Sequence, residues 1–359
     1  WRFRRRRFWP SCRWTRERVT TSDTLVIQTA FLGDVVLTTP LLSSLAGRYG
    51  PVDVVTTPAA APLLEGHPAV AEVVRYDKRG ADAGPGGLWR IGRLLRQRGY
   101  ARAFLPHRSL RTAVLALLAG AAERTGFADA AGAVTYTSRI PRPRTGHETD
   151  RLLALAGASP RQAEPPSLGL TAADHAAADE WLRGRGIVPG FVAMAPGSIW
   201  GSKRWPFYPE LAAALGDPIV IVGGRDDTAL GNEVLAAAEG RSWNAAGELG
   251  LRASAALLGR ASVLITNDSA PLHLAAAAGT PVVAIFGPTV PEFGFGPRGP
   301  RDAVVQLSGL ACRPCSSHGP RVCPLGHHRC MIELSVERVA AAVSGITGAE
   351  ARRAIRTGD

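Results

Sequence analysis

Long hydrophobic runs are missing from this sequence of 359 residues. The longest, residues 113–122, lies between Arg111 and Glu123 and falls well short of the roughly 20 residues that a membrane-spanning helix needs. The Arg-rich N-terminus also lacks the apolar stretch of a secretory signal. We therefore expect neither a membrane-spanning helix nor export. A hydrophobic content of 46% is enough for a sizeable core, and the length favours two domains.

Acidic residues are scarce in the first twenty residues, which contain eight arginines and one glutamate and carry most of the net charge of +12. This composition predicts a disordered leader over residues 1–21. A basic, tryptophan-containing arm on an anionic membrane surface is a second interpretation, and contact with nucleic acid is a third. We expect no basic stripe with interleaved aromatics beyond the leader, so the sequence does not favour a nucleic-acid-binding protein.

Apolar runs of four to six residues alternate with longer amphipathic or Ala- and Leu-rich stretches. This alternation predicts parallel sheets built from βαβ units. The expected strands are residues 24–28, 52–56, 73–76, 103–106, 191–195, 219–222, 263–266 and 282–286. Expected helices at 152–158 and 172–185 flank a Pro-rich linker at 159–170. We expect two doubly wound domains, 22–170 and 171–345, that face a cleft, followed by a tail or helix at 346–359.

The segment 263–291 combines an apolar strand, a polar turn and an Ala-rich helix that Gly279 ends. The first amides of a helix lack intrahelical partners and, with the helix dipole, form a site for anions such as phosphate. Asp268 and Ser269 in the turn either cap the helix or contact a ligand. His273, near the first turn, is either a structural hydrogen-bonding group or a phosphate contact. The segment predicts one wall of a nucleotide site.

Gly33 and Asp34 follow the first expected strand and begin a helix. Glycine permits a close backbone approach, and a carboxylate at the carboxyl end of a parallel strand faces the ligand cleft. Asp34 there would accept a proton from a substrate hydroxyl. A carboxylate that only caps the helix explains the same spacing, and the residues alone leave both interpretations open.

The loop 195–206 follows another expected strand and contains Ser198, Lys203 and Arg204. Its hydroxyl and cations suit a pyrophosphate clamp in which Lys203 stabilises charge on a leaving phosphate. A solvated, exposed pair of charges is the alternative. Gly223 and Gly224, at the end of the next expected strand, would let the backbone approach a nucleotide. A turn capped by an acid explains these glycines equally well.

Four of the five cysteines, Cys312, Cys315, Cys323 and Cys330, fall within nineteen residues. The CxxC start suits a structural zinc or iron–sulfur site. Reduced structural thiols and disulfides are the alternatives. Because the segment comes after the loops that carry the predicted chemistry, we do not expect it to be catalytic.

Five motifs together resemble the lipopolysaccharide heptosyltransferases of glycosyltransferase family 9, most closely the heptosyltransferase II branch. They are TLVIQTAFLGDVVLTTPLL, PHRSLR, PGSIWGSKRWP, TNDSAPLHLAAAAGTPVVAIFGPT and CRPC…CPLGHHRCM. The resemblance implies a GT-B fold, an α/β architecture of two Rossmann-like domains around a cleft. It also implies transfer of a heptose from ADP-heptose to a heptosyl-Kdo-lipid A acceptor in the lipopolysaccharide inner core. Such an enzyme would lie in the cytoplasm, at the inner membrane, and would use no nucleic acid.

The resemblance also implies residue roles. It places the general base on Asp34 and the loop lysine on Lys203. The donor-binding stretch falls on Asp268, Ser269 and His273. An inverting reaction follows, with no cofactor required for catalysis.

Acceptor contacts are an expectation from charge and placement. Arg108 and Arg111, with the Gly33 turn, are expected to hold acceptor phosphates or carboxylates. Ala270 departs from the glycine that many relatives have.

A transferase with another nucleotide sugar or glycan acceptor is one competing hypothesis. A non-catalytic protein that binds a nucleotide sugar or a metal on the same fold is the other.

Overall fold

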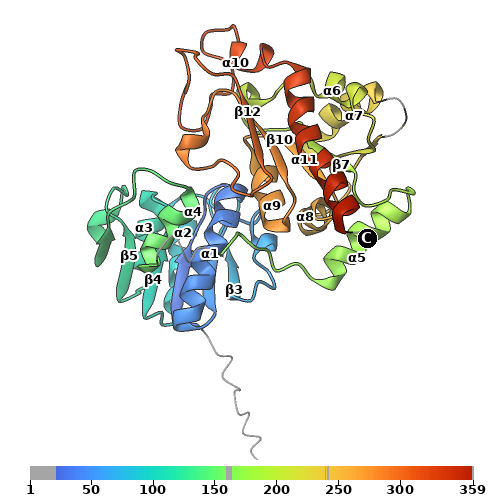
Figure 1. The fold of residues 1–359 in the computed structure, drawn as a ribbon. Helices are drawn as coiled ribbons and strands as arrows, with labels where there is room; N and C mark the ends of the chain where they lie inside the picture. Colours follow the sequence, from blue (N-terminus) through green and yellow to red (C-terminus); the bar gives the residue numbers. More distant parts are fainter. Residues whose placement is uncertain (1–21, 159–163, 239, 241, 358–359) are drawn as a thin grey trace, which may run out of the picture.

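The computed structural model describes residues 22–158, 164–238, 240 and 242–357. The leader at 1–21 and residues 159–163 of the expected linker lie outside the described residues. The described chain forms two six-stranded sheets flanked by helices (Figure 1). We call the part up to residue 158 the N-terminal half and the part from residue 164 the C-terminal half.

Both sheets are wholly parallel and have the same strand order. The N-terminal sheet, ordered β3-β2-β1-β4-β5-β6, contains β1 (Thr24–Ile27), β2 (Val52–Thr56), β3 (Val70–Arg75), β4 (Arg102–Leu105), β5 (Glu123–Phe127) and β6 (Ser138–Ile140). The C-terminal sheet, ordered β12-β11-β10-β7-β8-β9, contains β7 (Val192–Ala195), β8 (Ile219–Ile221), β9 (Ser242–Asn244), β10 (Val263–Asn267), β11 (Val282–Phe286) and β12 (Ala303–Gln306). This is the doubly wound order of Rossmann-like folds, and it confirms the predicted fold class.

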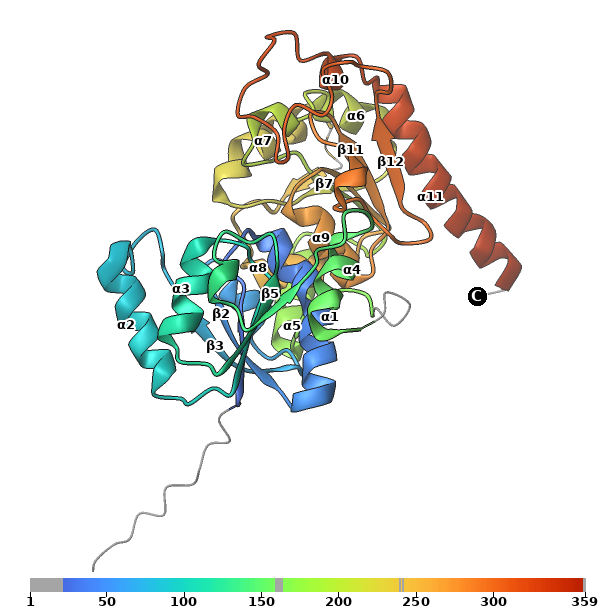
Figure 2. The same cartoon turned by 90° about the vertical axis from the view of Figure 1, so that its left-hand side faces the viewer.

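Helices cover the faces of each sheet. They are α1 (Leu32–Tyr49), α2 (Gly84–Arg96), α3 (Leu110–Leu118), α4 (Glu148–Leu153), α5 (Ala172–Arg183), α6 (Tyr208–Ala214), α7 (Thr228–Ala237), α8 (Leu251–Leu258), α9 (Ala270–Ala278), α10 (Arg329–Ile332) and α11 (Val336–Thr357). The buried side chains of Val339 and Val343 pack α11 onto the C-terminal sheet (Figure 2). Within the described residues, none of the helices combines the length and the apolar character needed to span a bilayer.

All eight expected strands are present, with ends that differ by a few residues. The sequence did not predict β5, β6, β9 and β12. Three of these, β6, β9 and β12, lie at sheet edges, where only one side pairs with a neighbour. Edge strands bury less surface and carry more polar residues, so they lack the continuous apolar run that marks a central strand.

The two halves are in direct contact. Val36 and Leu63 of the N-terminal half belong to one buried apolar cluster with Leu272 of the C-terminal half. At one side of this cluster, Arg252 of α8 donates to the Pro62 carbonyl oxygen at 2.8 Å. At the other side, Arg151 of α4 donates to the Phe293 carbonyl oxygen at 2.6 Å. The carboxyl ends of both sheets therefore meet at an interface closed by packing and hydrogen bonds.

Candidate active site

A buried ion pair joins two loops at the point where the C-terminal sheet reverses its strand order. Lys203 follows β7, and Asp268 follows β10. Lys203 Nζ donates to Asp268 Oδ2 at 2.6 Å and to the Asp268 carbonyl oxygen at 3.2 Å. The Thr289 hydroxyl donates to the same Oδ2 at 2.6 Å. Both charged side chains are buried, so the interpretation of Lys203 as a solvated, exposed charge is wrong.

The ammonium group of Lys203 has capacity for one more partner. Lysine carries three N–H donors, and Asp268 accepts two hydrogen bonds from them. Within the described part of the chain this leaves one donor of a buried ammonium for a single phosphate oxygen, and a charge-assisted bond there is stronger than one in bulk water. The pair therefore both fixes the loop and presents a cation.

Asn267, which the sequence analysis did not single out, holds the same loop in place. Its Nδ2 donates to the Pro196 carbonyl oxygen at 2.9 Å, and its Oδ1 accepts from the Trp205 amide at 3.1 Å. Arg204 Nε donates to the Ser198 carbonyl oxygen at 2.9 Å, so Arg204 and Ser198 brace the loop from within. The sequence signal for this role was the position of Asn267, directly before Asp268 at the end of an expected strand. An amide side chain has both a donor and an acceptor, so it can join two strand ends.

The start of α9 has no side-chain cap within the described structure. Ser269 occupies the cap position, but its hydroxyl accepts no helix amide and instead lies 3.4 Å from Thr266 Oγ1. Asp268 is engaged by Lys203 and Thr289. The interpretation of these two residues as helix caps is therefore wrong. Gly279 ends the helix in the left-handed conformation, as predicted.

His273 of α9 lies where the two halves touch. A Cβ atom at Gly33 would be only 2.5 Å from His273 Cδ2, so only glycine allows this approach. Burial lowers the pKa of His273 to about 4, with Asp268 opposing the shift and Lys203 adding to it. The imidazole is therefore neutral at physiological pH. It can hydrogen-bond a phosphate but brings no positive charge to it.

Asp34 is the third residue of α1, directly beyond Gly33 at the same interface. Its Oδ2 accepts a hydrogen bond from the Phe31 amide at 3.1 Å. Burial raises the pKa of Asp34 to about 6; the Phe31 amide opposes this shift and the nearby Glu148 carboxylate adds to it. Asp34 thus contacts the helix start and also has the proton affinity of a base that works near neutral pH, so the two interpretations do not exclude each other.

A basic cluster lies at the carboxyl edge of the N-terminal sheet. Arg111 Nη1 donates to the Lys78 carbonyl oxygen at 3.1 Å, and Lys78 Nζ donates to the Thr29 carbonyl oxygen at 2.5 Å. Arg108 pairs with Asp129 at 2.6 Å and stays half exposed. Burial, with help from neighbouring arginines, lowers the pKa of Lys78. Lys78 was not predicted, although lysine is rare in this chain: only Lys78 and Lys203 occur, against forty arginines.

Gly223 and Gly224 form a turn that an acid caps, as one interpretation proposed. The Gly224 amide donates to Asp227 Oδ2 at 2.9 Å. A Cβ at Gly223 would lie 2.8 Å from Asp227 Cβ, and one at Gly197 would lie 2.0 Å from Asp227 Oδ1. The turn after β8 therefore packs closely against the loop after β7, which also carries Lys203.

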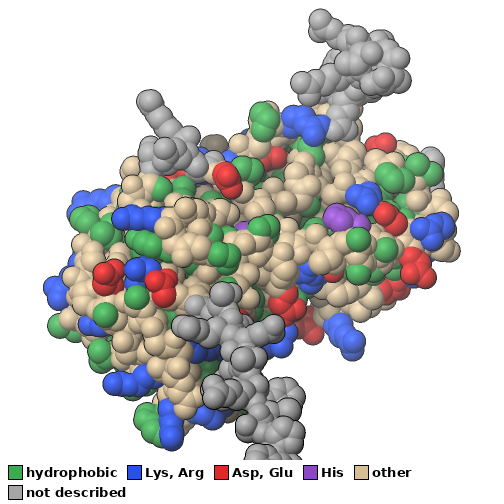
Figure 3. Space-filling model, turned by 90° about the horizontal axis from the view of Figure 1, so that it is seen from below, with side chains coloured by type: hydrophobic (Ala, Val, Ile, Leu, Met, Phe, Trp, Pro, Cys, Tyr) green, Lys and Arg blue, Asp and Glu red, His purple; other side chains and the backbone are tan. Residues whose placement is uncertain are grey.

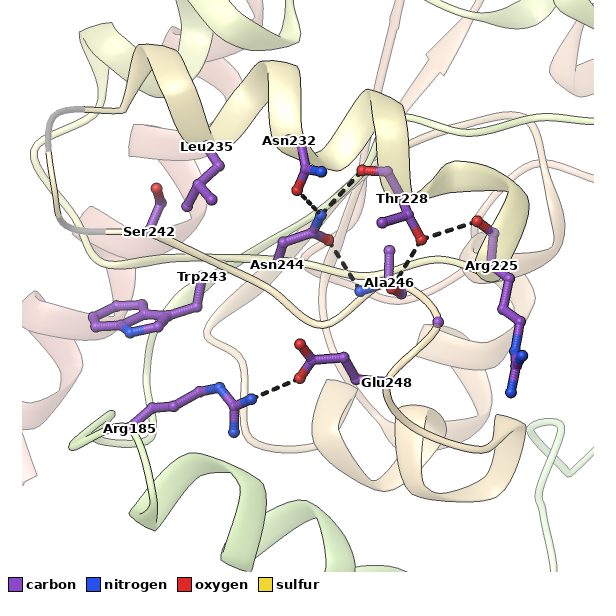
Figure 4. Close-up of a pocket in the computed structure, with 11 residues that line it drawn as sticks. Arg185, Arg225, Thr228, Asn232, Leu235, Ser242, Trp243, Asn244, Ala246 and Glu248 are labelled. Carbon is purple, nitrogen blue, oxygen red and sulfur yellow. Dashed lines mark hydrogen bonds and ion pairs between the residues drawn. The ribbon is translucent and has the colours of Figure 1, made fainter.

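The pocket of Figure 4 opens beside this turn. It has a volume of about 630 Å³ and runs along the free edge of β9, where Asn244 Nδ2 donates to Asn232 Oδ1 at 2.8 Å and Arg185 pairs with Glu248 at 2.7 Å. None of the predicted site residues lines it. Lys203, Asp268 and His273 are instead buried outside this pocket, Asp34 is half-buried, and Arg108 and Arg111 are exposed.

The cysteine segment 312–330 packs directly on the Lys203 loop. A Cβ at Gly319 would lie 3.1 Å from Lys203 Cε. His328 Nε2 lies 2.7 Å from the Ser202 carbonyl oxygen, and the Ser202 hydroxyl donates to the Pro320 carbonyl oxygen. The segment reaches the Lys203 loop despite its late position in the chain, because β12 before it is parallel to the other strands and ends at the same edge of the sheet as β7.

The four thiols of this segment are free in the structure and form no disulfide. Cys312, Cys315 and Cys323 line one cavity of about 180 Å³. Burial and the neighbouring thiolates raise the pKa of Cys330 to about 11. Within the described residues, no three His, Cys, Asp or Glu side chains are arranged to hold a metal ion. Three of the four thiols thus share a cavity, but among the described residues they are not arranged as a coordination sphere.

Comparisons with known proteins agree with this architecture. The model of the family described as glycosyltransferase family 9 (heptosyltransferase) matches residues 88–325. Lipopolysaccharide heptosyltransferase 2 of Salmonella typhimurium is 30% identical over 294 residues, which are 75% of this chain and 84% of that protein.

Solved structures give the same result. ADP-heptose lipopolysaccharide heptosyltransferase II of E. coli is 25% identical with a TM-score of 0.74, covering 91% of this chain and 99% of that one. A family 9 glycosyltransferase of Veillonella parvula is 25% identical with a TM-score of 0.80, covering 90% and 96%. Together with the paired sheets and the polar side chains at their facing edges, these matches show that the chain belongs to glycosyltransferase family 9 and is a glycosyltransferase.

Proposed function

We propose that this enzyme transfers a heptose from ADP-heptose to the inner core of lipopolysaccharide, on a heptosyl-Kdo-lipid A acceptor, with inversion at the anomeric carbon. One observation carries the proposal. The Lys203–Asp268 pair and His273 form a wall suited to a nucleoside diphosphate. His273 also packs against Gly33, the residue before Asp34. The names of the relatives supply the sugar and the acceptor class.

The chemistry needs one base and one charge stabiliser. Asp34 removes the proton from an acceptor hydroxyl as that oxygen forms a bond to the anomeric carbon. The bond from that carbon to the phosphate oxygen breaks on the opposite face, and ADP leaves with the electron pair. The free N–H of Lys203 and the uncapped amides at the start of α9 stabilise the departing diphosphate. Because these groups carry the charge, catalysis needs no divalent cation.

Donor binding uses the C-terminal wall. Asp268 holds Lys203, and Ser269 lies where α9 presents its first amides. His273 contributes a neutral hydrogen bond. Gly223 and Gly224, together with the braced loop at Ser198 and Arg204, shape the backbone around the nucleotide.

Acceptor binding uses the N-terminal wall. Lys78, Arg108 and Arg111 surround the strand ends next to the Thr29–Asp34 turn. Their cations suit phosphates or carboxylates of an inner-core acceptor. Lys78 extends the set that the sequence predicted.

We also propose a structural metal at Cys312, Cys315, Cys323 and Cys330. Soft thiolates suit zinc or an iron–sulfur centre, and three of the four line a shared cavity. A bound metal would fix the cysteine segment on the Lys203 loop and would take no part in the transfer. Metal analysis of the purified protein tests this: loss of stoichiometric metal in C312S/C315S supports it, and metal-free wild-type protein contradicts it.

The function is tested by incubating purified protein with ADP-heptose, with and without heptosyl-Kdo-lipid A. ADP release that requires the acceptor supports the proposal. ADP-heptose that is not consumed, while another nucleotide sugar or another glycan acceptor is used, supports the competing transferase instead. The product's anomeric configuration, read by NMR, tests inversion.

A further inference from the structure

We propose that the outer face of α2 and α3 docks the enzyme on an anionic membrane surface. We call this the α2–α3 face; its residues are Trp89, Arg93, Leu94, Arg96, Leu110, Arg111 and Leu117, together with Val134 of the 3-10 turn Ala133–Thr135, which contacts α3. It deepens the proposed function by naming the surface on which a lipid-linked acceptor would be met, and it rests on that function only for the identity of the acceptor. In Figure 2, α2 and α3 lie side by side along the N-terminal sheet, away from the C-terminal half.

The charge of this region is one-sided. Residues 84–122 contain seven arginines and no aspartate or glutamate. Four of the seven form ion pairs with acids outside this range: Arg90 with Asp82, Arg98 with Asp53 and Glu72, Arg102 with Asp23, and Arg108 with Asp129. Within the described residues, Arg93 and Arg96 form no ion pair. Arg93 and Arg96 of α2 therefore remain as the cations of this region that are available to an anionic surface.

Apolar side chains are exposed on the same face. Trp89 and Leu110 are each 56% exposed, Leu117 is 48% exposed and Val134 is 79% exposed. The guanidinium carbon of Arg93 lies 5.5 Å from the centroid of the Trp89 ring. Tryptophan beside arginine is favoured at the boundary of headgroups and acyl chains, where the ring and the cation find different partners. Water offers no apolar partner for the tryptophan ring.

Packing makes the face continuous. A Cβ at Gly92 would lie 2.5 Å from Leu118 Cβ, so glycine lets α2 lie directly against α3. Ile91 and Leu95 turn into the core of the N-terminal half, which leaves Trp89 and its neighbours pointing outward. Figure 3, a view from below, shows basic (blue), hydrophobic (green) and acidic (red) side chains on its left-hand part.

The face adjoins the proposed acceptor site. Leu110 and Arg111 form the first turn of α3, and Arg111 donates to the Lys78 carbonyl oxygen. Lys78 in turn contacts Thr29, at the turn that leads to Asp34. A lipid-linked acceptor held in a bilayer against this face would therefore present its sugar headgroup at the edge where Asp34 lies.

A bilayer fits this face better than a second copy of the chain. Two copies that met through it would bring their unpaired arginines together, and like charges in contact repel. An anionic bilayer offers negative charge for Arg93 and Arg96 and an apolar layer for Trp89. Charge and exposed apolar area thus favour the same occupant.

The test measures binding of the full chain to vesicles by flotation, with no donor or acceptor present, so its result does not depend on the transfer reaction. Vesicles of phosphatidylcholine alone are compared with vesicles that also contain phosphatidylglycerol. We expect binding only to the anionic vesicles, weakened at least roughly tenfold in R93E/R96E. R183E/R338E changes the charge equally on the C-terminal half and should bind like the unaltered protein.

Apolar contacts are tested in W89A/L117A, with V188A/I332A as the control that removes exposed apolar side chains elsewhere. We expect weaker binding only in W89A/L117A. Melting temperatures that match the unaltered protein establish that each variant folds. The proposal is overturned if anionic vesicles are not preferred, or if R93E/R96E binds normally while R4Q/R5Q/R6Q/R7Q in the leader abolishes binding. It is also overturned if face variants change only self-association, measured by light scattering.

Discussion

Asp34 and Asp268 each lie beyond the carboxyl end of a central strand, β1 in one sheet and β10 in the other, and their surroundings differ. Asp268 is held by the Lys203 ammonium and the Thr289 hydroxyl. Asp34 accepts a hydrogen bond from the Phe31 amide, and among the described residues it has no cation partner. Burial raises its pKa to about 6. One carboxylate therefore serves as part of a clamp, and the other is able to exchange a proton near neutral pH.

This contrast shows how one fold, used twice, divides a reaction. The C-terminal edge brings a cation and helix amides to a diphosphate, and the N-terminal edge brings a base and a basic cluster to a second substrate. The two edges meet at Gly33 and His273. The predictions that follow test whether the roles are divided in this way.

The largest expected effect is on turnover in D34N. Loss of a general base should lower the rate by about a thousandfold, while affinity for ADP-heptose should stay within roughly twofold because the donor wall is intact. ADP release and donor titration measure the two quantities. D268N provides the contrast, since it should weaken donor binding. If D34N weakens donor binding as much as D268N does, Asp34 is structural and the division of roles fails.

A smaller effect, on stability, is expected in K203A. Removing the cation leaves the Asp268 carboxylate buried without its partner, which costs about 3 kcal/mol in free energy of unfolding. The double variant K203A/D268N should recover part of this loss, because no buried charge is then left unpaired. Urea denaturation measures both. Equal stability of K203A and the unaltered protein would show that the pair is not buried in solution.

Acceptor recognition should depend on the N-terminal wall alone. K78Q and R111Q should each raise the acceptor KM by roughly tenfold, since each removes one charged contact to an anionic group. The affinity for the donor should not change. R139Q, on β6 of the same half, is the matched control and should have a normal KM. A change in donor affinity in K78Q would place Lys78 on the wrong wall.

The smallest expected effect is the stability difference between D34N and the unaltered protein. The folded-state pKa of about 6 lies above the ordinary aspartate value of 3.8, so the unaltered fold loses stability as the pH rises between these values. With allowance for solvent screening, D34N should be more stable by about 1 kcal/mol at pH 8. The difference should vanish below about pH 4. Denaturation at the two pH values measures it, and an equal difference at both would contradict the raised pKa.

Periodicity and turn residues predicted the central part of each sheet well. The strand at 282–286 and the helix end at Gly279 appear where expected, because both depend on local sequence. The edge strands β6 and β9 escaped prediction, since short polar segments gain their structure from one neighbouring strand and carry little local signal.

The sequence predicted most residues of the site, but it did not predict which of them are in contact. Asp268 and Lys203 are 65 residues apart, and only the parallel order of β7 and β10 brings them together. The same is true of the cysteine segment, which lies on Ser202 despite its late position. Lys78 is half-buried beside Thr29 for the same reason. Contacts that arise from the order of the strands in a sheet cannot be read from the spacing of residues along the sequence.

The pH dependence of turnover tests the central claim most directly. With saturating ADP-heptose and acceptor, the rate should fall about tenfold per pH unit below a midpoint near 6, because only the deprotonated Asp34 accepts the hydroxyl proton. The residual rate of D34N should lack this midpoint. A midpoint near 6 that persists in D34N would assign the titration to another group and contradict the role of Asp34.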